Sequence, residues 1–375
     1  MKAAITLLVF CVGALLSLGM VMLYSAGMTR GGAQFFLAQL AWCGLGLIAC
    51  LSAAWFDYRW LKKLAIPMLI VSVILLGLVL IPGIGFETKG ARRWFRLGIG
   101  SFQPSEAAKL ALICALAWYG ARYQRHMHTF TKGLVIPGVF ILLVLGLIFV
   151  EPDRGTTILL AAVSGTMLLL AGVRWLYIIP PVALGSFAIS LSLWFDDVRR
   201  SRILSWLDPE AHKLDTGYQS WQAMVALGSG GWQGLGLGNG RQKMGFLPEH
   251  HTDFIFSIIG EELGLIATLG VILLFVIFII CGLYIAWRAP DTFGMLLGSG
   301  ITFLIGLQAF INIGVVTSAL PNKGLPLPFI SYGGSNLLMM LISVGILLSI
   351  ARHSESWSEL TQPAGRDELP DPQPA

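Results

Sequence analysis

Residues 254–286 read FIFSIIGEELGLIATLGVILLFVIFIICGLYIA, an apolar run whose only charged residues are Glu261 and Glu262. A helix that crosses a bilayer needs about 20 mostly apolar residues, because the hydrocarbon core is about 30 Å thick. The run therefore predicts a transmembrane helix. Nine more stretches show the same character, so the predicted spans are 4–27, 35–55, 64–82, 106–120, 134–150, 156–173, 176–194, 254–286, 292–317 and 333–351.

The composition of the whole chain supports a membrane protein. Of its 375 residues, 56% are hydrophobic and 12% are charged, whereas soluble domains carry about 25% charged residues. A soluble protein of this size would expose much of that apolar surface to water. These values exclude a soluble enzyme, a disordered chain and a fibrous protein. The five cysteines lie in apolar runs without a CxxC pair, so the sequence predicts neither a disulfide framework nor a zinc site.

The predicted fold is an all-α integral membrane protein of about ten transmembrane helices, because lipid leaves no water to satisfy an irregular backbone. A long extracytoplasmic loop separates the seventh and eighth spans. Residues 1–352 form one polytopic domain. Residues 353–375 are polar and rich in proline and acidic residues, which predicts a disordered cytoplasmic tail.

The lysines and arginines of the short loops orient the chain, since cytoplasmic loops carry an excess of them. With the N-terminus inside, both termini are cytoplasmic and the cytoplasmic cations are Arg59, Lys62, Lys63, Arg122, Arg125, Lys132, Arg174, Arg288 and Arg352.

Two predicted outer loops depart from this charge rule. The loop near 83–105 contains Lys89, Arg92, Arg93 and Arg96, and the loop near 195–254 contains six more cations and three of the six histidines. An anionic ligand at the outer face would explain these cations. Arginines that reach toward lipid headgroups would explain them equally well.

Asp253 follows the polar loop that ends at Pro248 and is predicted to lie in the first turn of the helix that begins at about Thr252. Thr and Asp commonly cap helix N-termini, and position alone favours this interpretation. The alternative is a general base at the membrane surface, kept ionised with help from the helix dipole.

Glu261 and Glu262 would lie roughly 12–14 Å deeper along that helix. A pair of glycosidase carboxylates needs about 5–9.5 Å between its members, so neither glutamate can be the partner of Asp253. Charged groups at this depth are expected to face inward and to be paired. We interpret both as structural or conformational residues.

The fourth span opens with Ser101–Lys109, in which Ser105 is a candidate cap. Glu106 and Lys109 are three residues apart, so they share a helix face. An ion pair inside the bundle is the more common arrangement, and a pair that lines a cavity for a lipid substrate is the alternative.

The segment Pro321–Ser335 contains three prolines and several glycines beside the last span. Irregular backbone at membrane depth is tolerated only where it is buried in protein or lines a cavity. The segment is therefore predicted to be a re-entrant part of a site. No nucleotide loop, catalytic triad, HExxH motif or nucleic-acid module accompanies it, so these motifs by themselves would suggest a transporter.

Four motifs resemble the SEDS family of bacterial cell-wall proteins (shape, elongation, division, sporulation) over about residues 5–352. They are Ala91–Trp94, Gln103–Glu106 with Lys109, Asn239–Gly264 and Pro321–Ser335. The motifs Asn239–Lys243, Gly260–Gly264 and Asn322–Leu325 look like the division branch more than the elongation branch. Asn336 stands where the family more often has serine.

The resemblance implies a peptidoglycan glycosyltransferase that polymerises lipid II in the bacterial inner membrane, at the division septum, together with a class B penicillin-binding protein and other divisome proteins. It implies that Asp253 is the catalytic residue. The predicted substrate-binding residues are Arg92, Arg93, Arg96, Glu106, Lys109, Lys243, His251, Ser331 and Ser335. No nucleic-acid partner and no metal-ligating residue are predicted.

The glycosyl transfer that the resemblance implies needs only one carboxylate, which acts as the base. The acceptor hydroxyl would attack the anomeric carbon of the donor, Asp253 would remove its proton, and undecaprenyl pyrophosphate would leave. Arginines or a divalent cation, Mg²⁺ or Mn²⁺, would neutralise the leaving group. A lipid II flippase, an elongation glycosyltransferase and a non-catalytic divisome scaffold stay open as alternatives.

Overall fold

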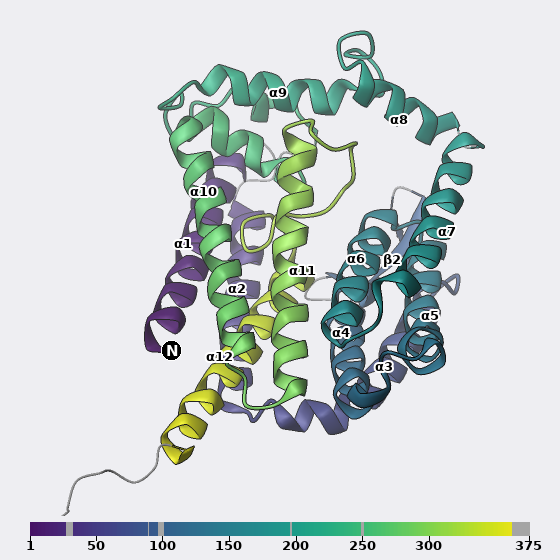
Figure 1. The fold of residues 1–375 in the computed structure, drawn as a ribbon. Coiled ribbons are helices and arrows are strands. Elements are labelled where there is room, and N and C mark those ends of the chain that lie inside the picture. The colour runs from purple at the N-terminus through teal and green to yellow at the C-terminus, as the bar shows by residue number, and fades with distance from the viewer. Residues whose placement is uncertain (28–32, 89, 97–100, 196, 249–250, 362–375) are drawn as a thin grey trace, which may run out of the picture.

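The computed structural model describes residues 1–27, 33–88, 90–96, 101–195, 197–248 and 251–361 (Figure 1). Ten helices occupy the ten predicted ranges within these residues. They are α1 (Lys2–Gly27), α2 (Ala33–Trp55), α3 (Arg59–Val79), α4 (Pro104–Arg122), α5 (Ile136–Val150), α6 (Arg154–Leu170), α7 (Trp175–Trp194), α10 (Ile255–Trp287), α11 (Thr292–Val316) and α12 (Gly334–Thr361).

Seven candidate membrane spans, judged by length and hydropathy, lie in the described part of the chain. They fall within α1, α2, α3, the α5 region from Thr131, α10, α11 and α12, while α6 and part of α7 are shorter apolar helices. The helix over the predicted fourth span, α4, is not among them. It carries Glu106, Lys109 and Arg122, and most of its residues are buried inside the protein. The multi-pass fold is therefore confirmed, while ten crossings stay a prediction.

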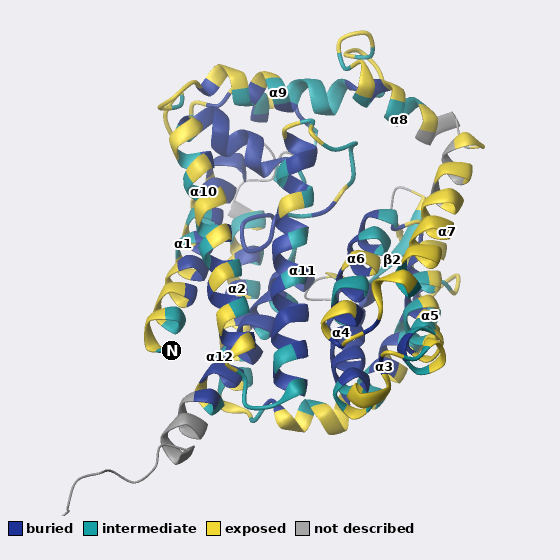
Figure 2. Ribbon diagram, viewed as in Figure 1, coloured by how far each residue is buried: buried dark blue, intermediate teal, exposed yellow. Residues whose placement is uncertain are grey.

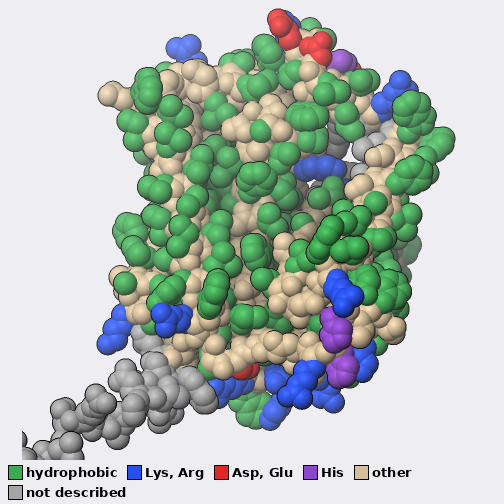
Figure 3. Space-filling model, viewed as in Figure 1, with side chains coloured by type: hydrophobic (Ala, Val, Ile, Leu, Met, Phe, Trp, Pro, Cys, Tyr) green, Lys and Arg blue, Asp and Glu red, His purple; other side chains and the backbone are tan. Residues whose placement is uncertain are grey.

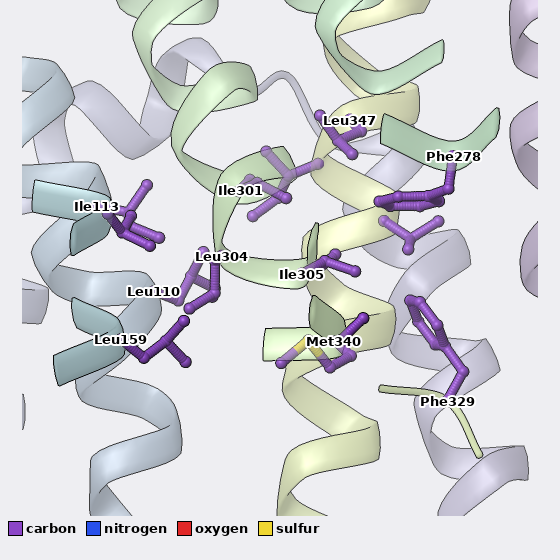
Figure 4. Close-up of a cluster of buried hydrophobic side chains, with 14 of the residues drawn as sticks. Leu110, Ile113, Leu159, Phe278, Ile301, Leu304, Ile305, Phe329, Met340 and Leu347 are labelled. Carbon is purple, nitrogen blue, oxygen red and sulfur yellow. The ribbon is translucent and has the colours of Figure 1, made fainter. Parts of the chain in front are cut away.

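The centre of the bundle is formed by α11 and α12, whose apolar windows are each 72% buried, against 22–39% for the other candidate spans. Figure 4 shows their side chains Ile301, Ile305 and Met340 in the cluster of buried apolar side chains. Large apolar side chains on the outer helices are exposed, such as Leu142 and Ile48. Figure 3 shows that hydrophobic side chains cover most of one face of the molecule. That surface suits lipid rather than water.

The long segment between α7 and α10 contains helices, which the sequence analysis did not anticipate. These are α8 (Asp197–Leu207), α9 (Tyr218–Gly230) and the short 3₁₀ helix η3 (Gln242–Met244). In Figure 1, α8 and α9 run across the top of the molecule. The helices α4 and α5 are joined through a 3₁₀ turn at Gln124–His126 (η1) and a π turn at Thr131–Val135 (η2).

A small antiparallel sheet forms in the predicted outer loop near 83–105. Its strands are β1 (Phe86–Thr88), β2 (Ala91–Arg96) and β3 (Ser101–Phe102), in the order β1-β2-β3. The positive φ of Gly90 makes the tight turn between β1 and β2 possible. The sheet lies beside α3 and α4 and brings three arginines onto one strand.

Helix α12 continues through Thr361, so the first nine residues of the predicted tail are helical and the prediction of disorder is wrong for them. Residues 353–361 are helical, and residues 362–375 lie outside the described residues. The start of α1 and the last turns of α12 lie at the same end of the bundle, where lysines and arginines also gather on the visible face (Figures 1 and 3). The cytoplasmic location of both termini stays a prediction.

Candidate active site

Asp253 lies in a turn before α10, one residue ahead of the N-cap residue Phe254. The prediction that it lies in the first helical turn is wrong, and so is its assignment as the N-cap residue. The physical reason is tertiary: three consecutive backbone carbonyls of this turn are bound by groups from elsewhere in the chain, which keeps them out of the helix.

The three carbonyls belong to His251, Thr252 and Asp253. The backbone N–H of Tyr332 donates to His251 over 3.0 Å, and the Ser331 hydroxyl donates to Thr252 over 2.6 Å. The Asn312 amide donates to the Asp253 carbonyl over 2.9 Å. The turn therefore has a fixed backbone position.

The Asp253 carboxylate faces the segment Pro321–Ser335. A Cβ atom built on Gly324 would lie 2.8 Å from Asp253 Oδ2, closer than real side chains allow. A side chain at position 324 would therefore displace the carboxylate from its position beside the segment. Sequence reasoning grouped these two motifs only through the family resemblance, and the structure brings them into contact.

The segment Pro321–Ser335 is irregular and largely buried, as predicted for backbone at membrane depth. Leu325, Leu327 and Phe329 are each at most 3% exposed, and Phe329 has a positive φ of 66°. The Ser331 hydroxyl also accepts a bond from the Leu327 N–H over 2.8 Å, which closes a tight loop. This loop presents one edge to the Asp253 turn.

Glu106 and Lys109 form the ion pair that their spacing predicts, with 2.8 Å between Glu106 Oε2 and Lys109 Nζ. Both side chains are buried, and the gap between the neighbouring helices there does not admit water. Asn336 donates to Glu106 over 3.0 Å, and Lys109 donates to Gln308 over 3.0 Å. The ion-pair interpretation is confirmed, and a role of the pair in substrate binding stays a prediction.

Ser105 does not cap α4, because the helix begins at Pro104 and its N-cap residue is Gln103. The Ser105 hydroxyl is buried without a hydrogen-bond partner. Ser335 accepts from the Gln103 N–H over 3.2 Å and donates to the Ser101 carbonyl over 3.0 Å. Its hydroxyl thus anchors the start of α4, and a contact to substrate stays a prediction.

The predicted arginine cluster of β2 is divided between the two faces of the strand, because side chains alternate along it. Arg92 forms an exposed ion pair with Glu87 over 3.2 Å, and Arg96 lies over the Phe86 ring. Arg93 points the other way and donates to the Glu151 carbonyl over 2.8 Å. Arg92 and Arg96 therefore share the face opposite Arg93, and substrate binding by the three arginines stays a prediction.

Glu151, the C-cap residue of α5, is fully buried. Both of its carboxylate oxygens lack a hydrogen-bond partner. Burial and the nearby Asp153 raise its pKa to about 8, and Arg93 opposes this shift. Asp153 itself caps α6 through the Thr156 N–H. In the sequence, this buried carboxyl could have been recognised as an acidic residue that directly follows an apolar run.

Lys243 and Glu262 are both buried, and Lys243 Nζ lies 2.6 Å from Glu262 Oε1. Glu261 accepts backbone N–H groups of Arg241 and Gln242. The prediction that both glutamates face inward is confirmed, and the predicted ion pair is present for Glu262. Lys243 was predicted to bind substrate, and its geometry here favours a role in holding the loop to α10, so substrate binding by Lys243 stays a prediction.

His251 packs its ring against Phe35 and Tyr332, with centroid distances of 5.3 and 6.1 Å. It lies two residues from Asp253 and borders the same turn. Two residues of this region, Gln308 and Asn312, were missed by the sequence analysis. They are polar residues inside a predicted span, and such residues usually face the protein interior.

Divalent cations prefer clusters of carboxylate and imidazole ligands. Among the residues that the structure describes, no group of three or more His, Cys, Asp or Glu side chains could share a metal ion. Mg²⁺ is often held by one or two carboxylates together with phosphate oxygens of a ligand, and a bound Mg²⁺ or Mn²⁺ ion stays a prediction for this protein.

Comparisons with known proteins identify the family of this chain. The model of the cell cycle protein family FtsW/RodA/SpoVE matches residues 4–356. The chain is 42% identical to "Probable peptidoglycan glycosyltransferase FtsW" of Geobacter metallireducens, over 90% of this chain and 92% of that protein. It is 38% identical to "Stage V sporulation protein E" of Bacillus subtilis, over 93% and 97% of the two chains.

Solved structures show the same fold. A chain of a peptidoglycan synthase complex that coordinates polymerization and crosslinking matches with a TM-score of 0.78 and 29% identity, over 92% of this chain and 97% of that one. The rod shape determining protein RodA of Thermus thermophilus matches with a TM-score of 0.69 and 29% identity, over 92% and 96%. This protein belongs to the cell cycle protein family that comprises FtsW, RodA and SpoVE.

Proposed function

We propose that this chain is a peptidoglycan glycosyltransferase of the SEDS type, which polymerises lipid II during cell division. The observation that carries the proposal is the contact between the Asp253 carboxylate and Gly324, with the Asp253 backbone fixed by Asn312. A carboxylate held in one place at the end of a membrane helix is suited to remove a proton from a bound hydroxyl. The relatives named as peptidoglycan glycosyltransferases support the same activity.

In the proposed reaction, the acceptor hydroxyl of one glycan attacks the anomeric carbon of a second. The Asp253 carboxylate takes the hydroxyl proton, the new glycosidic bond forms, and undecaprenyl pyrophosphate leaves with the electron pair of the broken C–O bond. Attack opposite the leaving group inverts the anomeric carbon. Pyrophosphate leaves as a stable anion, so a second carboxylic acid is not required.

The charge of the leaving pyrophosphate needs cationic neighbours. Arg92 and Arg96 lie on one face of β2, and they are the proposed contacts. A divalent cation, when bound, would supply further charge neutralisation. The arginine side chains would orient the phosphates in either case, since guanidinium groups bind phosphate through two parallel hydrogen bonds.

The protein is proposed to act in the bacterial inner membrane at the septum, with both termini in the cytoplasm, together with a class B penicillin-binding protein and other divisome proteins. The likeness to a chain of a synthase complex supports a crosslinking partner. Cysteines placed at Arg92 and Lys63 should react with an impermeant reagent from outside and inside, respectively. The reverse labelling would contradict the orientation.

The decisive experiment for the function is Asp253→Asn in purified protein with lipid II. Asn preserves the shape of the side chain but cannot act as the carboxylate base. Polymerisation should fall by about 100-fold or more, while folded yield and lipid II binding persist. Polymerisation at a near wild-type rate would exclude Asp253 as the base. The same result would instead favour the lipid II flippase, which does not need Asp253.

A further inference from the structure

Two polar side chains of α11 lie one helical turn apart on its buried face. Gln308 and Asn312 are 0% and 1% exposed, and residues four apart on a helix share one face. Buried amides are costly unless their hydrogen bonds are made. The hydrogen-bond partners of these two amides therefore indicate the role of Gln308 and Asn312.

The Asn312 amide joins two segments that are far apart in the sequence. Its Nδ2 atom donates to the Asp253 carbonyl over 2.9 Å and to the Leu325 carbonyl over 2.6 Å. Two carbonyl acceptors require the NH₂ end of the amide at this position, which fixes its orientation. Asn312 thus clamps the Asp253 turn to the segment that follows Gly324.

The Gln308 amide joins the same segment to the buried ion pair. Its Oε1 atom accepts from Lys109 Nζ over 3.0 Å, and its Nε2 atom donates to the Pro326 carbonyl over 2.9 Å. Leu325 and Pro326 are consecutive, so the two amides hold adjacent peptide groups of one segment.

Gly324 precedes these two peptide groups and touches the Asp253 carboxylate. An unbroken series of contacts therefore runs from Glu106 and Lys109 through Gln308, the segment and Asn312 to Asp253. Asp253 contributes its backbone to this series, while its carboxylate stays directed at Gly324.

We propose that Asn312 and Gln308 are positioning residues for Asp253, which fix its carboxylate relative to the Pro321–Ser335 segment and link it to the Glu106–Lys109 pair. The inference rests on the proposed function of Asp253 as base. Misplacement of a reacting group by about 1 Å can cost about 100-fold in rate. Neither amide is required to touch the substrate for this effect.

The test compares Asn312→Ala and Gln308→Glu with the wild type in purified protein. Asn312→Ala removes both clamping bonds. Gln308→Glu keeps an acceptor for Lys109 but removes the donor to Pro326. The expected result is a fall in kcat of about 100-fold for Asn312→Ala and about 10-fold for Gln308→Glu, with KM for lipid II changed less than about 3-fold.

Thr302→Val is the matched control. Thr302 is also buried on α11, but its hydroxyl donates to the Gly298 carbonyl of the same helix over 2.8 Å. This variant should keep wild-type kcat. A fall in kcat equal to that of Asn312→Ala would show that any lost buried hydrogen bond on α11 impairs the enzyme, and it would overturn the proposal.

A double variant separates positioning from a merely structural role. If Asn312 acts through Asp253, then Asp253→Asn with Asn312→Ala should be no slower than Asp253→Asn alone. Losses that multiply would overturn the proposal, and so would wild-type kcat in folded Asn312→Ala. An active Asp253→Asn variant would instead refute the proposed function, so the two failures are distinguishable.

Discussion

Lys243 Nζ lies 2.6 Å from Glu262 Oε1, and neither side chain reaches solvent. Ser25 of α1 donates to the same carboxylate and accepts from Lys243 over 2.8 Å. The Gly238 N–H adds a fourth contact, over 2.9 Å. This cluster ties the long segment after α9 to α1 and α10, and it explains how two charges can remain inside the protein.

Lys243→Met should destabilise the protein by about 3–5 kcal/mol, because it leaves the buried Glu262 carboxylate without its cation. The double variant with Glu262→Gln should recover part of this loss. Thermal unfolding in detergent measures both. The control is Glu87→Gln, which breaks the exposed pair with Arg92 and should cost about 1 kcal/mol or less. Equal losses for the two single variants would contradict a dry, buried pair.

Glu106→Ala should lower stability by about 3–5 kcal/mol and abolish activity, since Lys109 would keep only Gln308 as a partner in a low dielectric. Asn336→Ala removes one donor to Glu106 while the ion pair remains, so its cost should be nearer 1–3 kcal/mol. Unfolding midpoints and folded yields rank the two variants. An unchanged melting temperature for Glu106→Ala would mean that both groups reach water.

The stability of the protein should fall as the pH rises from about 5 to about 8. The pKa of Glu151 is raised from its ordinary value of 4.5 to about 8 by burial and by Asp153. Across that window the folded state keeps a proton that the unfolded chain has lost, so the free energy of unfolding drops by about 1.4 kcal/mol per pH unit.

Gln at position 151 does not titrate, so Glu151→Gln should remove this pH dependence. At pH 8 its melting temperature should therefore be higher than that of the wild type. Arg93→Met removes the opposing positive charge and should extend the window to higher pH. Melting temperatures at pH 5, 6.5 and 8 measure the effect. Parallel curves for wild type and Glu151→Gln would refute the raised pKa.

Gly264 interrupts α10 with a φ of 77°, and the glycine-rich segment before η3 packs into the break. The Leu265 N–H donates to the Gly231 carbonyl over 2.9 Å. A Cβ on Gly264 would collide with backbone atoms of Trp232 and Gly234. Gly264→Ala should therefore be strongly destabilising, in the range of about 1–3 kcal/mol or more.

The control for that substitution is Gly270→Ala in the same helix. Nothing lies within 4 Å of a Cβ built on Gly270, and alanine favours a helix over glycine by about 1 kcal/mol. This variant should be neutral or stabilising. Denaturation in detergent compares the two, and a stable Gly264→Ala would mean that the break in α10 is not needed.

The sequence alone was sufficient for features that depend on composition or on neighbours along the chain. Runs of apolar residues predicted the helices of the bundle, because a bilayer demands length and hydropathy whatever the neighbours are. The pair Glu106–Lys109 followed from a spacing of three residues, since helix geometry fixes which side chains meet. The prolines of Pro321–Ser335 predicted a broken, buried segment.

Tertiary structure alone decided which distant groups meet. Asn312 and Gln308 look like isolated polar residues in an apolar span until packing brings Asp253, Leu325 and Pro326 to them. Packing also decided that the side chains of Arg92 and Arg93 have different partners. It likewise decided that Lys243 forms an ion pair with Glu262. The spacing of residues along a helix fixes contacts only within about one turn. Partners that are distant in the sequence depend on how whole helices pack against one another. No pattern in a single sequence encodes how one helix is aligned against another.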